Sequence, residues 1–262
     1  METIILYTLL GLAAGLIAGL FGVGGGLIIV PVLVILFESQ EVSSSALVHL
    51  AIGTSLATIV VTSISSMRAH HRHGAVRWNI FRDLTPGIVI GALLGAVVAD
   101  FLPTPVLRVV FGIFELAVAI QIGFNFMASP HRQLPGRLLM STAGVVIGTV
   151  SSVVGIGGGT MTVPFLVWCN VSIREAVATS SACGLPIAIA GATGFVLTGW
   201  SEPGLPSGST GYLYWPAFLG IAAASIFSAP LGAKLTHTLP VEVLRRIFAG
   251  LLAVLGVRML IG

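Results

Sequence analysis

Charged side chains are scarce in this sequence. Asp, Glu, Lys and Arg make up 8% of its 262 residues, against roughly 25% in an average soluble domain. Apolar residues make up 56%, and the mean hydropathy is +1.06. The few charges fall between apolar stretches of about 20 residues, the length of a helix that crosses a bilayer. This composition excludes a soluble protein and a nucleic-acid-binding surface, and it predicts a multi-pass membrane protein.

Cysteine is also rare. Cys169 and Cys183 lie in or beside apolar segments and provide neither a disulfide framework nor a metal-ligand spacing. We therefore expect no cofactor and no metal.

No signal peptide stands out at the N-terminus. The segment 1–37 lacks a positively charged start and stays apolar far beyond the length of a signal sequence. We expect it to remain in the mature protein.

Signatures of enzymes and of nucleotide-driven pumps are missing too. The chain has no Gly-x-Ser-x-Gly elbow, no His-Glu-x-x-His pair and no nucleotide-binding motif. Glu115 is the one acidic residue well inside an apolar run, whereas a cation transporter usually needs several carboxylates or imidazoles there. These absences disfavour an intramembrane enzyme and a cation transporter.

The apolar runs form two corresponding sets of four. Alternating strand patterns of about ten residues are absent, so helices must satisfy the backbone groups inside the bilayer. We expect an all-α polytopic membrane protein with about eight to ten membrane segments, built as a first repeat over 1–129, a cytoplasmic linker over 130–137 and a second repeat over 138–262. The runs are 4–37, 46–66, 84–102 and 106–127, followed by 138–168, 176–198, 213–233 and 243–262.

A glycine cluster interrupts the first run of each set. The clusters read Gly22-Val-Gly-Gly-Gly26 and Gly155-Ile-Gly-Gly-Gly159, and each is followed after five residues by a proline. Further along, Ala51-Ile-Gly-Thr-Ser55 resembles Ala176-Val-Ala-Thr-Ser180. The sequence thus contains two copies of one broken unit. Broken apolar segments at matching positions of two halves are the best sequence pointer to the binding site of a transporter.

Loop charge predicts how the broken runs cross the membrane. Short cytoplasmic loops retain Lys and Arg. Basic residues gather in 67–82, in the linker and in 234–246, whereas 38–45 and 200–212 carry only acidic charge. Each broken run must then leave and re-enter on one side as a helical hairpin, and the halves must form an inverted repeat. An eight-span parallel repeat stays open if loop 200–212 does not follow the charge rule.

The glycine clusters are candidate anion-binding elements. Consecutive glycines leave backbone N–H groups uncovered, and a helix that begins just after them adds the partial positive charge of its N-terminus. Two such ends that converge could replace part of the hydration shell of a small oxyanion. Close helix packing is the alternative explanation. The candidate substrate-binding glycines are Gly22, Gly24, Gly25, Gly26, Gly155, Gly157, Gly158 and Gly159.

Polar residues within the later runs add to this candidate site. Hydroxyl groups can donate to an anion without a buried charge, although they also bond to helix carbonyls. For Glu115 the alternatives are proton coupling and a structural hydrogen bond or ion pair, and the second half has no matching acid. The candidate substrate-binding hydroxyls are Thr54 and Ser55 in the first half and Thr179, Ser180 and Ser181 in the second.

The segments around the glycines resemble a known signature. Gly15-Leu-Ile-Ala-Gly-Leu-Phe-Gly-Val-Gly-Gly-Gly-Leu-Ile-Ile-Val-Pro31 and its copy over 148–164 are similar to the paired motif of the TauE/SafE family of sulfite exporter-like permeases. The resemblance covers nearly the whole chain. It implies an inner-membrane transporter of small sulfur-containing anions, such as sulfite, sulfoacetate or related organosulfonates, with about eight spans in two repeats.

The expected function is therefore secondary transport of a small sulfur-containing anion, directed outward, by alternating access between the two glycine breaks. A passive anion channel is the alternative. The lipid bilayer and the anion are the expected partners, with protons as a candidate coupling ion and no nucleic acid. The sequence leaves open which anion is carried, the direction, the coupling ion and whether the chain forms a homo-oligomer.

Overall fold

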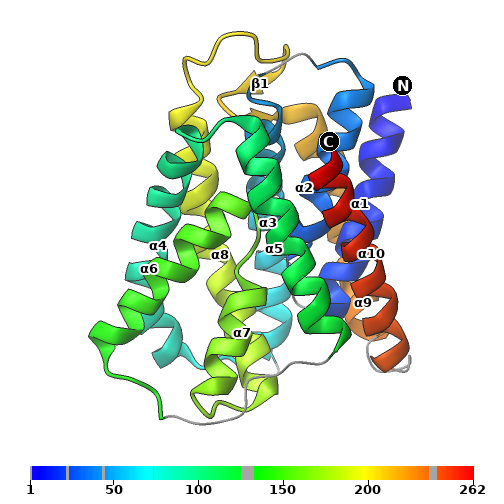
Figure 1. The fold of residues 1–262 in the computed structure, drawn as a ribbon. Helices are drawn as coiled ribbons and strands as arrows, with labels where there is room; N and C mark the ends of the chain where they lie inside the picture. The colour runs from blue at the N-terminus through cyan, green and yellow to red at the C-terminus, as the bar shows by residue number, and fades with distance from the viewer. Residues whose placement is uncertain (1, 22–23, 43–44, 73, 125–132, 236–240) are drawn as a thin grey trace.

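The computed structural model describes residues 2–21, 24–42, 45–72, 74–124, 133–235 and 241–262 (Figure 1). Within these ranges the chain forms ten α-helices and one two-stranded hairpin, which confirms the all-α class. Five helices come before residue 125, namely α1 Glu2–Phe21, α2 Gly26–Ser39, α3 Leu47–Arg72, α4 Trp78–Asp100 and α5 Thr104–Gly123.

The second half also contains five helices in its described residues, together with a short hairpin. Its elements are α6 Arg137–Val154, α7 Gly159–Trp168, α8 Ile173–Thr198, β1 Ser209–Thr210, β2 Leu213–Tyr214, α9 Trp215–Leu235 and α10 Val241–Ile261. The strands are antiparallel, and Ser209 pairs with Tyr214. Both glycine clusters fall where one helix ends and the next begins, as the sequence predicts.

The long helices have the length and composition of membrane spans. In the described part of the chain six helices qualify: α3, α4, α5, α6, α8 and the portion Trp215–Gly232 of α9. Large apolar side chains are exposed along their outer faces, for example Leu94, Val97 and Val98 on α4. Such a belt is unstable in water and suits contact with lipid. The structure therefore agrees with a multi-pass membrane protein.

The basic segment after α3 differs from expectation. The charge pattern predicted a loop over 67–82, but α3 continues to Arg72 and α4 begins at Trp78. Most of that predicted loop is therefore helical. A helix can extend beyond the hydrocarbon, and cationic residues in its last turn interact favourably with the negative end of the helix dipole.

Helices from the two halves pack against each other throughout the fold. α1 packs against α9, α4 against α6, α3 against α8 and α5 against α10. Glycine allows the closest approach, since a Cβ atom added at Gly91 of α4 or at Gly148 of α6 would clash with a backbone carbonyl of the facing helix. The α3 helix is the most enclosed of the candidate spans, because 78% of the residues in its apolar stretch are buried. The pair α3 and α8 thus forms the centre of the molecule.

The connecting segments gather at two opposite ends (Figure 1). The segments after α2, α4 and α8 lie at the upper end, together with both chain termini. The segments after α3 and α7 and the start of α6 lie at the lower end. The two segments with only acidic charge therefore share one end, and residues 74–77, from the basic region 67–82, lie at the other.

Candidate functional site

The glycine clusters have backbone conformations that favour glycine. Gly25 precedes α2 with a φ of 81°, and Gly158 precedes α7 with a φ of 73°. Gly24 and Gly155 also have positive φ angles, 76° and 75°. These angles lie in the left-handed region that residues with a Cβ atom rarely adopt. Gly22 lies outside the described residues.

The two clusters touch each other inside the molecule. A Cβ atom added at Gly24 would lie 3.5 Å from Cα of Gly157, and one added at Gly26 would clash with the carbonyl oxygen of Gly155. Figure 1 shows α2 running from this contact toward the upper end and α7 toward the lower end. The structure therefore brings together two helix N-termini from different halves of the chain.

Ser55 connects the central helix α3 to this contact. Its hydroxyl is fully buried and donates a hydrogen bond to the carbonyl oxygen of Gly155 at 2.9 Å. This bond satisfies one polar group of a chain segment that lies outside any helix. Ser55 thus lies beside the candidate site, as its place in the sequence suggested, and it holds the second cluster against α3.

Thr54 and Thr179 share a structural role at matching positions of the two halves. The hydroxyl of Thr54 accepts a hydrogen bond from the backbone N–H of Tyr214 at 3.0 Å. The hydroxyl of Thr179 accepts one from the backbone N–H of Arg77, also at 3.0 Å. Each donor stands one residue before a helix of the opposite half, α9 or α4. Both threonines therefore hold the start of a helix in place.

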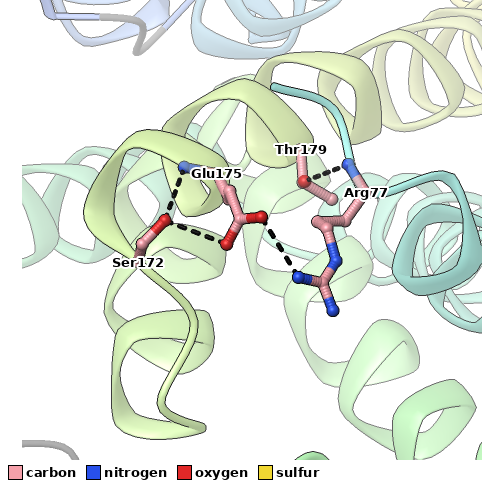
Figure 2. A network of polar contacts seen from close by, with 4 residues as sticks. All are labelled: Arg77, Ser172, Glu175 and Thr179. Atoms are coloured by element: carbon pink, nitrogen blue, oxygen red, sulfur yellow. Dashed lines mark hydrogen bonds and ion pairs between the residues drawn. The ribbon is translucent and has the colours of Figure 1, made fainter. Parts of the chain in front are cut away.

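Figure 2 shows how a polar network surrounds Thr179 at the lower end. Nη1 of Arg77 forms an ion pair of 3.1 Å with Oε1 of Glu175. The hydroxyl of Ser172 donates to Oε2 of Glu175 and accepts from its backbone N–H, which caps the N-terminus of α8. Serine followed three residues later by glutamate is a common helix-start pattern, so the sequence itself signals this cap.

The remaining serines of α8 differ in their bonding. Ser181 donates to the carbonyl oxygen of Val177 at 2.9 Å, the local bond that hydroxyls often make inside helices. Ser180 is buried, and its hydroxyl has no hydrogen-bond partner among the described residues. Of Ser180 and Ser181, only Ser180 therefore has a hydroxyl without a hydrogen-bond partner among the described residues.

Two buried hydroxyls near the second glycine cluster were not predicted from the sequence as site residues. Ser151 is in the last turn of α6 and Thr162 in the first turn of α7, and both are fully buried. A Cβ atom added at Gly158 would lie 3.4 Å from Oγ of Ser151 and 3.5 Å from Oγ1 of Thr162. The only signal in the sequence was their proximity to the glycines.

Glu115 is fully buried on α5, which packs mainly against α10. Neither of its carboxyl oxygens has a hydrogen-bond partner in the described part of the chain. The ion pairs that the structure gives in that part involve Glu38, Asp83 and Glu175 as their acids. The structural alternatives for Glu115, a hydrogen bond or a pairing with arginine, therefore find no support in these residues.

Aromatic side chains gather around Tyr212 of the hairpin. Tyr212, between the two strands, is buried and donates to Oδ1 of Asp100 at 2.9 Å. Its ring packs against Phe195 and His49. Burial, together with the neighbouring Asp100 carboxylate, raises the pKa of Tyr212 above its ordinary value. The phenol therefore remains a hydrogen-bond donor at neutral pH. The sequence predicted only a loop for this segment.

Comparison with known proteins assigns the chain to a family. The family described as "Sulfite exporter TauE/SafE" matches residues 7–259. The chain belongs to the TauE/SafE family. A probable membrane transporter protein of Haemophilus influenzae is 38% identical over 257 residues, which cover 98% of this chain and 97% of the relative. No solved structure shows significant similarity.

Other TauE/SafE relatives are more distant and are also matched over most of their length. A probable membrane transporter protein of Methanocaldococcus jannaschii is 30% identical, with 98% of this chain and 95% of the relative covered. One of Bacillus subtilis, YdhB, is 25% identical, with 88% and 89% covered. The family and these relatives confirm a membrane transporter that spans the bilayer several times.

Proposed function

We propose that this TauE/SafE protein is a secondary transporter that exports a small sulfur-containing anion, such as sulfite or an organosulfonate. Its substrate binds between the two glycine breaks, and access alternates between the two sides of the membrane. The observation that carries the proposal is the contact of Gly24 and Gly26 with Gly155 and Gly157, where two helices begin.

The chemistry of this contact favours an anion. The first N–H groups of a helix have no acceptor within it, and the helix dipole adds partial positive charge. The atoms nearest to Gly24, Gly26, Gly155 and Gly158 belong to glycine, apolar and hydroxyl residues. An anion can bind neutral N–H and O–H donors, whereas sites for metal cations usually contain carboxylates or imidazoles, and none is among these nearest atoms. The printed family description supports sulfite as one member of the substrate class.

An inverted repeat would provide the alternating access. If 1–129 and 138–262 are the repeats, α1 and α6 correspond, as do α4 and α9. Exchanging the halves then converts the packing pair of α1 with α9 into the pair of α6 with α4. The opposite directions of α2 and α7 support the same relation. Rocking of one half against the other would open the glycine contact toward each side in turn.

Charge gives the orientation and the driving force. The lower end carries basic residues and is the cytoplasmic side in our proposal, because short cytoplasmic loops retain Lys and Arg. An interior-negative potential favours expulsion of an anion by about 2.3 kcal/mol per charge per 100 mV. Glu115 is our candidate for proton coupling, because a buried carboxyl group without a partner can exchange a proton as its surroundings change.

Anion binding to the purified protein tests the proposal. Sulfite, thiosulfate, sulfoacetate and sulfate are titrated by calorimetry, with choline as a cationic control. We expect saturable binding of at least one sulfur anion and none of choline. Gly158→Ala, which forces a side chain onto a φ of 73°, should weaken that binding, whereas Gly250→Ala, in open space on α10, should not. Absence of binding for every anion would contradict the proposal.

A further inference from the structure

The second glycine break contains buried hydroxyls without partners. Ser151 and Thr162 are each 0% exposed, and neither hydroxyl oxygen has a hydrogen-bond partner among the described residues. Leaving a buried polar group unsatisfied costs about 1 to 3 kcal/mol. Two such groups close in space to one helix start therefore require an explanation.

Both hydroxyls lie beside Gly158, the residue that precedes α7, where the side chain of Ile187 is the nearest neighbour. They lie 3.4 and 3.5 Å from the position that a Cβ atom on Gly158 would occupy. The N–H groups of Met161 and Thr162 already bond to the carbonyl oxygen of Gly158, at 3.1 and 2.8 Å. The two earlier N–H groups of the helix, on Gly159 and Thr160, have no acceptor within it. Two hydroxyls and two N–H groups thus gather at one helix N-terminus.

The first break lacks these hydroxyls. Gly24 and Gly157 are matching positions, so Ser151 corresponds to Ala18, and Thr162 corresponds to Ile29. Ala18 and Ile29 are both buried and apolar. The two repeats therefore share the glycines and the half-helices but differ in their hydrogen-bond donors.

We infer that the substrate site is asymmetric and lies at the second break, where Ser151, Thr162 and the N-terminus of α7 bind the oxygens of a sulfite or sulfonate group. This inference rests on the proposed function and specifies which half supplies the donors. A sulfonate group offers three oxygens and one negative charge, which neutral donors can coordinate without a buried cation. The first break then covers the site, because Gly24 lies against Gly157.

Removal of single hydroxyls from the full-length protein tests the inference. Ser151→Ala and Thr162→Val should each weaken the binding of sulfite, or of the sulfur anion that binds best, by about tenfold, because a hydrogen bond to a charged group is lost. Thr162→Ser keeps the hydroxyl and should retain the affinity within about twofold. Affinity is measured by calorimetry, and thermal unfolding of each variant shows that it is folded.

Ser152→Ala is the matched control. Ser152 is also buried and unpartnered among the described residues, but its side chain lies against Gly95 of α4 and Gly191 of α8. Its removal should leave the affinity unchanged. Wild-type affinity in Ser151→Ala and Thr162→Val, or an equal loss in Ser152→Ala, would overturn the asymmetric site and leave the proposed function intact. Failure of the wild type to bind any anion would overturn both.

Discussion

At the scale of single residues, the buried hydroxyl groups differ in whether they have a hydrogen-bond partner among the described residues. Thr54 and Thr179 each accept a backbone N–H from the opposite half, which holds a helix start in place. Ser151 and Thr162 have no such bond in the described residues and lie next to Gly158. The sequence singled out the threonines because they are duplicated. The threonines occur in both halves, whereas the proposed ligand donors Ser151 and Thr162 occur in one half only.

Loss of the Thr179 hydroxyl should destabilise the fold. Thr179→Val leaves the backbone N–H of Arg77 without its acceptor, so the free energy of unfolding should fall by about 1 to 3 kcal/mol. Thr179→Ser should retain most of the stability. Unfolding in detergent, followed by circular dichroism, measures both variants. Equal stability of the valine variant and the wild type would show that the bond to Arg77 is not needed.

Replacing the carboxyl group of Glu115 should stop proton-driven transport of the anion but not its downhill exchange. In Glu115→Gln the side chain keeps its size but cannot release a proton. Uphill movement of the anion driven by a proton gradient should stop, while exchange down a gradient continues. Flux in proteoliposomes measures both activities, with the exposed Glu41→Gln as the control. Normal uphill transport by Glu115→Gln would exclude the coupling role.

At the scale of helices, the glycine breaks are the features that the sequence predicted best. Three helix-breaking residues in an apolar run and a duplicated proline were enough to place both breaks. The β-hairpin before α9 and the burial of Tyr212 were not predicted, because they depend on contacts with Phe195 and with residues of the first half. Loop charge likewise could not show that α3 continues to Arg72, since a helix can extend into water.

Close packing at the breaks predicts a strong effect of one added methyl group. In Gly26→Ala the new Cβ atom would clash with the carbonyl oxygen of Gly155, so the free energy of unfolding should fall by about 1 to 3 kcal/mol. Gly250→Ala, in the open on α10, should be neutral or stabilising by up to about 1 kcal/mol. The melting temperatures of the two variants are measured in detergent and compared with that of the wild type. Equal melting of both variants would contradict the packing at this contact.

At the scale of the whole molecule, the loops with only acidic charge share the upper end of the fold with both termini. The charge rule assigns this end to the outside of the membrane. The sequence predicted the grouping because loop charge reports topology directly. It could not show that α1 packs against α9 and α4 against α6, because packing between distant segments leaves no pattern in a single sequence.

Cysteine labelling of intact cells checks this orientation. The native Cys169 and Cys183 are buried, so they should contribute little signal. An exposed position of the acidic loop, in Ser207→Cys, should react with an impermeant maleimide from outside. Gln133→Cys, near the start of α6, should react only after the cells are lysed. The reverse pattern would invert the proposed topology and with it the assignment of the basic end.

The most direct test of the central claim is anion counterflow in proteoliposomes. Vesicles that contain the purified protein are loaded with unlabelled sulfite and diluted into a trace of radiolabelled sulfite. A transporter with one site of alternating access should accumulate the label transiently, saturate with concentration, and lose this activity in Gly158→Ala but not in Gly250→Ala. Flux that never exceeds equilibrium and does not saturate would indicate a channel, and counterflow unchanged in Gly158→Ala would remove the glycine contact from the transport site.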